Sequence, residues 1–256
     1  MTRDEKWLLE EKYGGKVTPQ FEADKERLAL GEPLGYIIGW QPFLGLKIYL
    51  DSKPLIPRPE TESWTEALIA DLEVRLAIGS RTSKLKFLDL CAGSGAIGCA
   101  ALARLPNAKV YFGEIDPAHE ATIRKNIREN LLAQAGGLDE SRTEIRIGDL
   151  FGPFNGLTFD LIAANPPYVP EGRMLPESVS KYEPAPALRA GADGLGVIRR
   201  IAAELPNYLA PNGQAWVECD SEHAQAARAL FSAQGLNADI RTDQYDRSRV
   251  VVVSFP

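Results

Sequence analysis

From residue 85 to the C-terminus the chain alternates short apolar runs with longer amphipathic stretches, and this alternation limits the fold more than any other feature. Five runs are typical of buried strands: LKFLDL (85–90), KVYFGEI (109–115), TEIRIGD (143–149), FDLIAA (159–164) and QAWVEC (214–219). Helical stretches follow most of them, at about 94–105, 117–132, 194–209 and 221–234. We therefore expect a mostly parallel sheet covered by helices on both faces. Two last runs, ADIRTD and RVVVVSF, allow an antiparallel pairing at the C-terminal end.

The residues before this region are organised differently. Residues 4–12 and 19–30 have helical character, and short alternating runs at Tyr36–Ile38 and Leu46–Leu50 predict a hairpin. A helix from Thr61 to Gly79 follows. We divide the chain into a short helical segment (1–30), a β-hairpin linker (31–60) and an α/β domain (61–256).

Composition narrows the class of function. The 256 residues carry a formal charge of −6, so the chain has no overall attraction for nucleic acid, and we expect no stable nucleic-acid partner. Three scattered cysteines and two histidines lack the spacing of a disulfide framework or a metal site, and we expect no metal. No apolar run is long enough to span a membrane, and the acidic N-terminus does not resemble a targeting peptide. We expect a cytoplasmic monomer.

The first strand ends in a glycine loop, DLCAGSGAIG. In open parallel sheets ligands bind outside the carboxyl ends of the strands, and Gly93 and Gly95 let the backbone turn sharply and approach one. The helix that follows offers free N–H groups. A dinucleotide fingerprint needs a third glycine at a spacing that this loop lacks.

Acidic residues follow the second and third strands. Asp116 could accept hydrogen bonds from both ribose hydroxyls of a nucleoside, with Glu114 as the alternative one pleat earlier. Asp116 could equally cap the helix that Pro117 opens. Asp149 could reach an adenine amino group, and Leu150 or Phe151 could pack on its ring. These features together predict a site for adenosine without a phosphate chain, which S-adenosylmethionine fits.

The fourth strand ends in NPPY, Asn165 to Tyr168. An amide or aromatic amino nitrogen is a poor nucleophile, so it has to be held in place. Asn165 Oδ1 and the Pro166 carbonyl can each accept one of its N–H groups, the prolines fix the backbone, and Tyr168 can stack on a planar group. The motif predicts a planar NH₂ substrate and leaves adenine, guanine and glutamine open. The acidic charge favours a protein amide, because a base in duplex DNA would have to be flipped out of a gripped duplex.

Five segments resemble a known family: GEPLGYIIGWQPFLGLKIYLDSKPLIPRPETE, DLCAGSGAIG, NPPYVP, YEPAPAL and GADGL. They are similar to the HemK/PrmC protein-(glutamine-N5) methyltransferases, from about Gly31 to the C-terminus, and IPRPETE together with NPPY is the most specific part. The resemblance implies a Rossmann-like, seven-stranded class I S-adenosylmethionine-dependent methyltransferase fold. It also implies methylation of the glutamine in the GGQ loop of class-1 peptide chain release factors.

The resemblance also assigns residues by position. Those implied to bind the cofactor are Cys91, Ala92, Gly93, Ser94, Gly95, Asp116, Asp149, Leu150 and Asn165. Asn165, Pro166, Pro167 and Tyr168 would bind the glutamine, and catalysis would rest on Asn165, Pro166 and Tyr168. Arg58 and Glu60 would lie close to the site, and Glu183 would order the loop after NPPY.

Two departures from the family pattern stand out. Cys91 occupies a position where the family often has glycine, and only about 30 residues precede GEPL, roughly half the usual helical N-terminal domain. His119 and Arg199-Arg200 are interpreted as surface residues. Two rival functions remain: an N-methyltransferase acting on adenine or guanine in nucleic acid, and a non-catalytic protein that binds the cofactor or a release factor.

Overall fold

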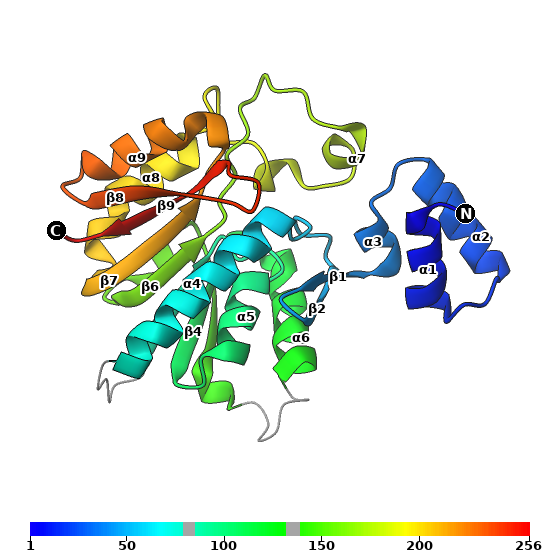
Figure 1. Cartoon of the computed structure of the whole chain (residues 1–256), viewed down its shortest axis with the longest axis horizontal. Helices are drawn as coiled ribbons and strands as arrows, with labels where there is room; N and C mark the ends of the chain where they lie inside the picture. The colour runs from blue at the N-terminus through cyan, green and yellow to red at the C-terminus, as the bar shows by residue number, and fades with distance from the viewer. Residues whose placement is uncertain (79–84, 132–138) are drawn as a thin grey trace.

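The computed structural model describes residues 1–78, 85–131 and 139–256, so the helix ends predicted at Gly79 and Leu132 lie outside the described residues. Seven strands form one sheet in the order β5-β4-β3-β6-β7-β9-β8 (Figure 1). Their bounds are β3 (Leu85–Leu90), β4 (Ala108–Glu114), β5 (Thr143–Ile147), β6 (Phe159–Ala164), β7 (Leu209–Glu218), β8 (Asn237–Thr242) and β9 (Ser248–Ser254). The strands from β5 to β7 pair in parallel, whereas β9 runs antiparallel to both β7 and β8. The predicted mostly parallel sheet, with its antiparallel C-terminal pair, is confirmed.

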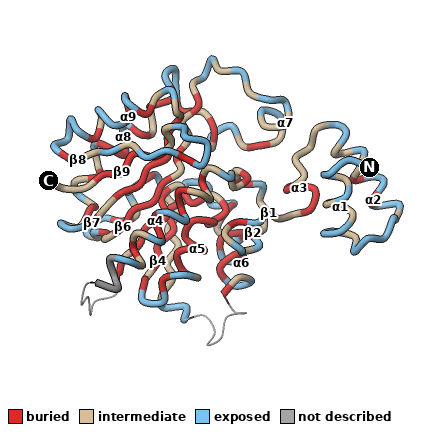
Figure 2. The backbone as a smooth tube through the Cα atoms, in the orientation of Figure 1, coloured by how far each residue is buried: buried red, intermediate tan, exposed pale blue. Residues whose placement is uncertain are grey.

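Helices cover both faces of this sheet, as predicted. One face packs against α4 (Pro59–Ile78), α5 (Ala96–Arg104) and α6 (Glu120–Leu131), and the other against α8 (Gly196–Glu204) and α9 (Ala224–Ser232). Successive residues of a strand point to opposite faces, so Phe87 and Leu88 of β3 belong to different core clusters. The central strands are therefore buried along most of their length (Figure 2).

Strand order reverses between β3 and β6, because the chain leaves β3 for β4 on one side and returns to β6 on the other. Such a switch point leaves a crevice at the carboxyl ends of the two strands. The glycine loop follows β3, and NPPY follows β6. The fold therefore brings the two predicted motifs to the same place.

The N-terminal residues form a small helical unit beside the sheet (Figure 1). Its elements are α1 (Arg3–Tyr13), α2 (Pro19–Ala29) and α3 (Leu34–Ile38), packed around Leu8, Phe21 and Ile37. The buried Asp24 is held by Lys12 Nζ and Tyr13 Oη, each at 2.6 Å. A hairpin of β1 (Trp40–Phe43) and β2 (Leu46–Tyr49) connects this unit to α4.

Two boundaries differ from the prediction. Tyr36–Ile38 is not a strand but lies in α3, where the Gly39 N–H donates to the Gly35 carbonyl and Gly39 ends the helix in the left-handed region (φ 96°). The predicted helix to residue 209 ends at Glu204, since Pro206 lies in a short 3₁₀ turn, and β7 begins at Leu209 rather than 214. A short helix, α7 (Glu177–Ser180), lies in the long loop after β6.

No helix within the described ranges combines the length and the apolar character needed to cross a membrane.

Candidate active site

Two cavities meet at the switch point of the sheet. The first, about 220 Å³, lies over the end of β3, and the second, about 310 Å³, lies beside the loop after β6. Leu55, Asn165 and Ala187 line both of them. The first cavity also contacts Cys91, Gly93, Glu114, Asp116, Asp149, Leu150 and Pro167. The second also contacts Arg58, Pro166, Tyr168, Arg173, Asp220 and Arg249.

The glycine loop forms the floor of the first cavity through only some of its residues. Cys91, Gly93 and Gly95 all have positive φ, at 61°, 55° and 76°, so the chain makes a succession of left-handed turns. Cys91 and Gly93 line the cavity. Cys91 thus occupies a conformation that favours glycine.

Ala92, Ser94 and Gly95 were expected to bind the cofactor, but they are not among the residues that line the first cavity. Ala92 and Ser94 are buried, and the Ser94 carbonyl accepts a hydrogen bond from Asn126 Nδ2 at 2.9 Å. Gly95 is the N-cap of α5, and a Cβ there would lie 3.1 Å from the Ile123 side chain. These three residues shape the loop rather than face the cavity.

Glu114, at the end of β4, is a buried acid that lines the first cavity. Its Oε2 accepts the Gly93 N–H at 2.7 Å, and its Oε1 accepts the Asp116 N–H at 2.9 Å. Asp116 is exposed at the rim, and its Oδ1 accepts the Ala118 N–H at 2.9 Å, which is the capping role considered for it. Glu114, the alternative in the sequence, is therefore the better placed of the two acids.

Asp149 and Leu150 also lie on the wall of the first cavity. Leu150 is buried, whereas Asp149 is about half exposed and pairs with Arg200 of α8 at 2.6 Å. Arg199 and Arg200 are exposed, as interpreted from the sequence, and Arg200 also lines the cavity. The pair of Asp149 and Arg200 forms part of the cavity rim.

Asn165 separates the two cavities, and its amide has one partner. Its Nδ2 donates to Thr61 Oγ1 at 3.1 Å. Its Oδ1 is buried and has no hydrogen-bond partner within the described residues. An orphaned buried acceptor costs free energy, so this oxygen is set up to accept an N–H group from a bound molecule.

Glu218, the last residue of β7, connects Asn165 to Tyr168. Its Oε2 accepts from Thr61 Oγ1 and Trp64 Nε1, both at 2.7 Å, and its Oε1 accepts from Tyr168 Oη at 2.9 Å. Burial raises the pKa of Glu218 above its ordinary value, although these three hydrogen bonds oppose the shift. Burial and the Glu218 carboxylate raise the pKa of Tyr168 well above its ordinary value, so its hydroxyl stays protonated. Tyr168 therefore presents an uncharged phenol to the second cavity and is not suited to act as a base.

The prolines of NPPY face different sides. Pro166 is buried and lines the second cavity, whereas Pro167, expected at the substrate, lines the first. The chain then passes close to Gly194 of GADGL, where a Cβ would lie 2.5 Å from the Tyr168 carbonyl oxygen. Glycine at 194 therefore lets the loop after β6 fold back against itself.

Glu183 fastens the connector, residues 50–58, to this loop. Its carboxylate accepts the Ile56 N–H at 3.1 Å and pairs with the Arg58 guanidinium. Arg58 lines the second cavity as expected for a residue near the site, whereas Glu60 lies in the first turn of α4 and lines neither cavity. Glu183 thus joins the YEP and IPRPETE motifs, which lie far apart in the sequence.

His119 was interpreted as a surface residue, but it is buried and lines the first cavity. Its Nδ1 lies 2.9 Å from Ser52 Oγ, which in turn accepts from Thr122 Oγ1 at 2.8 Å. These contacts fix the orientation of the His119 ring, so His119 adds a polar side chain to the cavity wall.

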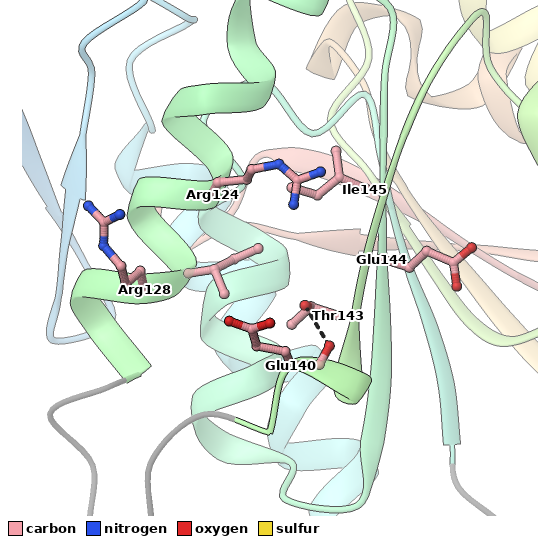
Figure 3. Close-up of a pocket in the computed structure, with 7 residues that line it drawn as sticks. Arg124, Arg128, Glu140, Thr143, Glu144 and Ile145 are labelled. Carbon is pink, nitrogen blue, oxygen red and sulfur yellow. Dashed lines mark hydrogen bonds between the residues drawn. The ribbon is translucent and has the colours of Figure 1, made fainter.

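A larger cavity of about 530 Å³ lies elsewhere, between α6 and β5 (Figure 3). Arg124, on its wall, already pairs with Glu120 at 2.6 Å. Thr143 Oγ1 donates to the Glu140 carbonyl at 3.1 Å, as the dashed line in Figure 3 marks. This cavity lies at the edge strand, away from the switch point, and we assign it no ligand.

The sequence motifs did not indicate several of the residues that form the site. Glu218 is a single acid at the end of an apolar strand, and Thr61 lies within IPRPETE, where only its neighbours were considered. Glu218 could have been identified from its position, because it is a charged residue at a strand end beside the predicted site. Arg200 and His119 lacked such a signal, since their approach to the cavity depends on how α8 and the turn before α6 pack.

Known proteins are similar to this chain in sequence and in fold. A family model described as Conserved hypothetical protein 95 matches residues 56–228. The release factor glutamine methyltransferase of Lactococcus lactis subsp. lactis is 31% identical over 250 residues, covering 96% of this chain and 86% of its own. The protein of that name from Geobacter sulfurreducens is 36% identical over 211 residues, covering 82% and 68%. The ribosomal protein L11 methylase structure from Lactobacillus delbrueckii subsp. bulgaricus matches with a TM-score of 0.54 at 16% identity, covering 84% of this chain and 90% of that one.

The strand order and the switch-point crevice, together with the likeness to a solved methylase, define a class I methyltransferase fold, which confirms the predicted fold class. The relatives narrow this class further. The chain belongs to the release factor glutamine methyltransferase family, as the quoted motifs indicated.

Proposed function

We propose that this protein transfers a methyl group from S-adenosylmethionine to the side-chain amide nitrogen of a protein glutamine, the GGQ glutamine of a class-1 peptide chain release factor. The observation that carries the proposal is the buried, unpartnered Oδ1 of Asn165 on the wall shared by the two cavities. An acceptor in that position suits a planar N–H group that enters from the second cavity.

The residues of the first cavity fit the proposed cofactor. Glu114 uses one lone pair on each oxygen, for the Gly93 and Asp116 N–H groups, so its carboxylate can still accept from ribose hydroxyls. Leu150 and Val197 offer apolar surface to an adenine ring. Arg200 is the one arginine among the described residues of this wall and is paired with Asp149, which suits a nucleoside without phosphates. When bound, S-adenosylmethionine supplies an electrophilic methyl group on its sulfonium sulfur.

The second cavity fits a glutamine side chain. An amide nitrogen is a weak nucleophile, so its orientation matters more than a strong base. Asn165 Oδ1 would hold one N–H group, and the raised pKa of Tyr168 keeps its ring neutral beside the amide. The relatives named release factor glutamine methyltransferase support glutamine over a nucleic-acid base, and the net charge of −6 agrees with that choice.

An assay with tritiated S-adenosylmethionine tests the proposal. We expect label in a class-1 release factor, no label in its GGQ-to-GGA variant, and no label in DNA or RNA. Label that persists in the GGA variant, or that enters only nucleic acid, would overturn the glutamine assignment. Tight cofactor binding without any transfer would instead identify a non-catalytic binding protein. The monomeric state and the cytoplasmic location stay predictions, and sedimentation of the purified chain checks the former.

A further inference from the structure

We infer that Thr61 is a positioning residue that fixes which atom of the Asn165 amide faces the substrate. The oxygen and nitrogen of an amide have nearly the same shape, so packing alone does not choose between its two orientations. Only the oxygen can accept an N–H group from a glutamine side chain. The inference rests on the proposed function for its consequence in catalysis, whereas its structural part stands independently.

The orientation of the Asn165 amide follows from Trp64, whose indole N–H can only donate a hydrogen bond. The indole Nε1 lies 2.7 Å from Glu218 Oε2. That oxygen must therefore be an acceptor. If Glu218 takes up a proton, the proton belongs on Oε1, which faces Tyr168 Oη at 2.9 Å. Oε2 remains an acceptor in both protonation states.

Because Glu218 Oε2 is an acceptor, Thr61 in turn fixes the orientation of the Asn165 amide. Its Oγ1 also lies 2.7 Å from Glu218 Oε2, so its single hydroxyl proton has to point at that oxygen. The Thr61 oxygen then has only lone pairs left for the Asn165 amide, 3.1 Å away. Asn165 must present its Nδ2 there, and Oδ1 is turned to the shared wall of the cavities. Thr61 itself is buried and lines neither cavity, so it acts through Asn165.

The two residues that donate to Glu218 Oε2 come from the same short stretch of sequence. Thr61 and Trp64 are three residues apart in the first turns of α4 and share a helix face. Thr61 is the threonine of IPRPETE. The resemblance implied positions near the site for Arg58 and Glu60 of this motif but no role for Thr61. The constraint therefore connects the ETE string with NPPY, 104 residues further along the chain.

The test compares Thr61→Val, which keeps the shape and removes the hydroxyl, with Thr61→Ser, which keeps the hydroxyl. In Thr61→Val the amide can turn over and present its Nδ2 to the substrate N–H. We expect kcat for release-factor methylation to fall about 10- to 100-fold with KM for S-adenosylmethionine within about twofold, as for loss of one preorganised polar contact. Thr61→Ser should stay within about threefold of the wild type. A wild-type kcat in Thr61→Val would overturn the inference.

A second measurement is independent of activity. In the full-length protein labelled with ¹⁵N-asparagine, the side-chain amide protons of Asn165 should exchange slowly in the wild type and in Thr61→Ser. We expect exchange about tenfold faster in Thr61→Val, or in Thr61→Ala if the valine variant does not fold. Equal exchange in all variants would refute the positioning role. A wild type that methylates no release factor would refute only the proposed function, since the exchange rates still decide the role of Thr61.

Discussion

The Glu114 carboxylate accepts the Gly93 N–H at 2.7 Å, so the acid that ends β4 and the glycine loop that follows β3 form one unit. Burying a carboxylate without such donors costs free energy. The same contact holds the loop in its left-handed turns beside the first cavity. Affinity for the cofactor should therefore depend on Glu114 more than on the exposed Asp116.

Replacing Glu114 tests this dependence. Glu114→Gln should weaken S-adenosylmethionine binding by about 2 kcal/mol, or about 30-fold in Kd, because the variant turns an amide donor toward either the loop or the ribose. Asp116→Asn serves as the matched variant and should change Kd less than about threefold. Titration calorimetry measures both constants. A larger loss in Asp116→Asn than in Glu114→Gln would show that the rim acid holds the ribose.

Removing the Asn165 amide should abolish transfer while the fold persists. Asn165→Ala removes the acceptor for the substrate N–H, and we expect kcat to fall about 100- to 1,000-fold. The thermal midpoint should change little, because the residue is half-buried at a loop. Asn155→Ala, in a residue that lines neither cavity, is the control. Near-normal turnover in Asn165→Ala would contradict the acceptor role.

The conformation of Cys91 carries a cost that glycine would relieve. Burial and the nearby Glu114 raise the pKa of its thiol, so the side chain is an inert apolar group at a positive φ of 61°. Cys91→Gly and Cys91→Ala both delete the sulfur, but only glycine removes the strain. We expect the glycine variant to be more stable than the alanine variant by about 0.5–1 kcal/mol. Urea unfolding compares the two, and a more stable alanine variant would show that the turn is unstrained.

Glu218 should give the stability of the protein a distinct pH dependence. Its folded-state pKa is raised above the ordinary 4.5, so the folded state binds this proton more tightly than the unfolded state. The contribution is fully present below pH 4.5 and is lost as pH rises through the folded-state pKa. Relative to Glu218→Gln, which does not titrate, the wild type should gain unfolding free energy as pH falls across that window. Denaturant unfolding at several pH values checks this, and a difference that shrinks on acidification would reverse the assigned shift.

The sheet was predictable because strands buried on both faces must be apolar along their whole length, and these runs end where turns or helices begin. The error at Tyr36–Ile38 arose because a short buried helix and a buried strand have the same composition. Asn165 was predictable because NPPY combines its chemistry within four residues. Glu218 and Thr61 were not, because their contact joins residues 157 positions apart and is created only by the packing of α4 on the sheet.

Leu55 belongs to the connector between the helical unit and the sheet, yet it lines both cavities, and Glu183 and Arg58 fasten the same stretch. The two parts of the chain are therefore not interchangeable modules. A chimera that takes its N-terminal helices from a relative has to keep residues 50–58 with the sheet, because a joint placed after them would exchange part of the wall of both cavities along with the helical unit.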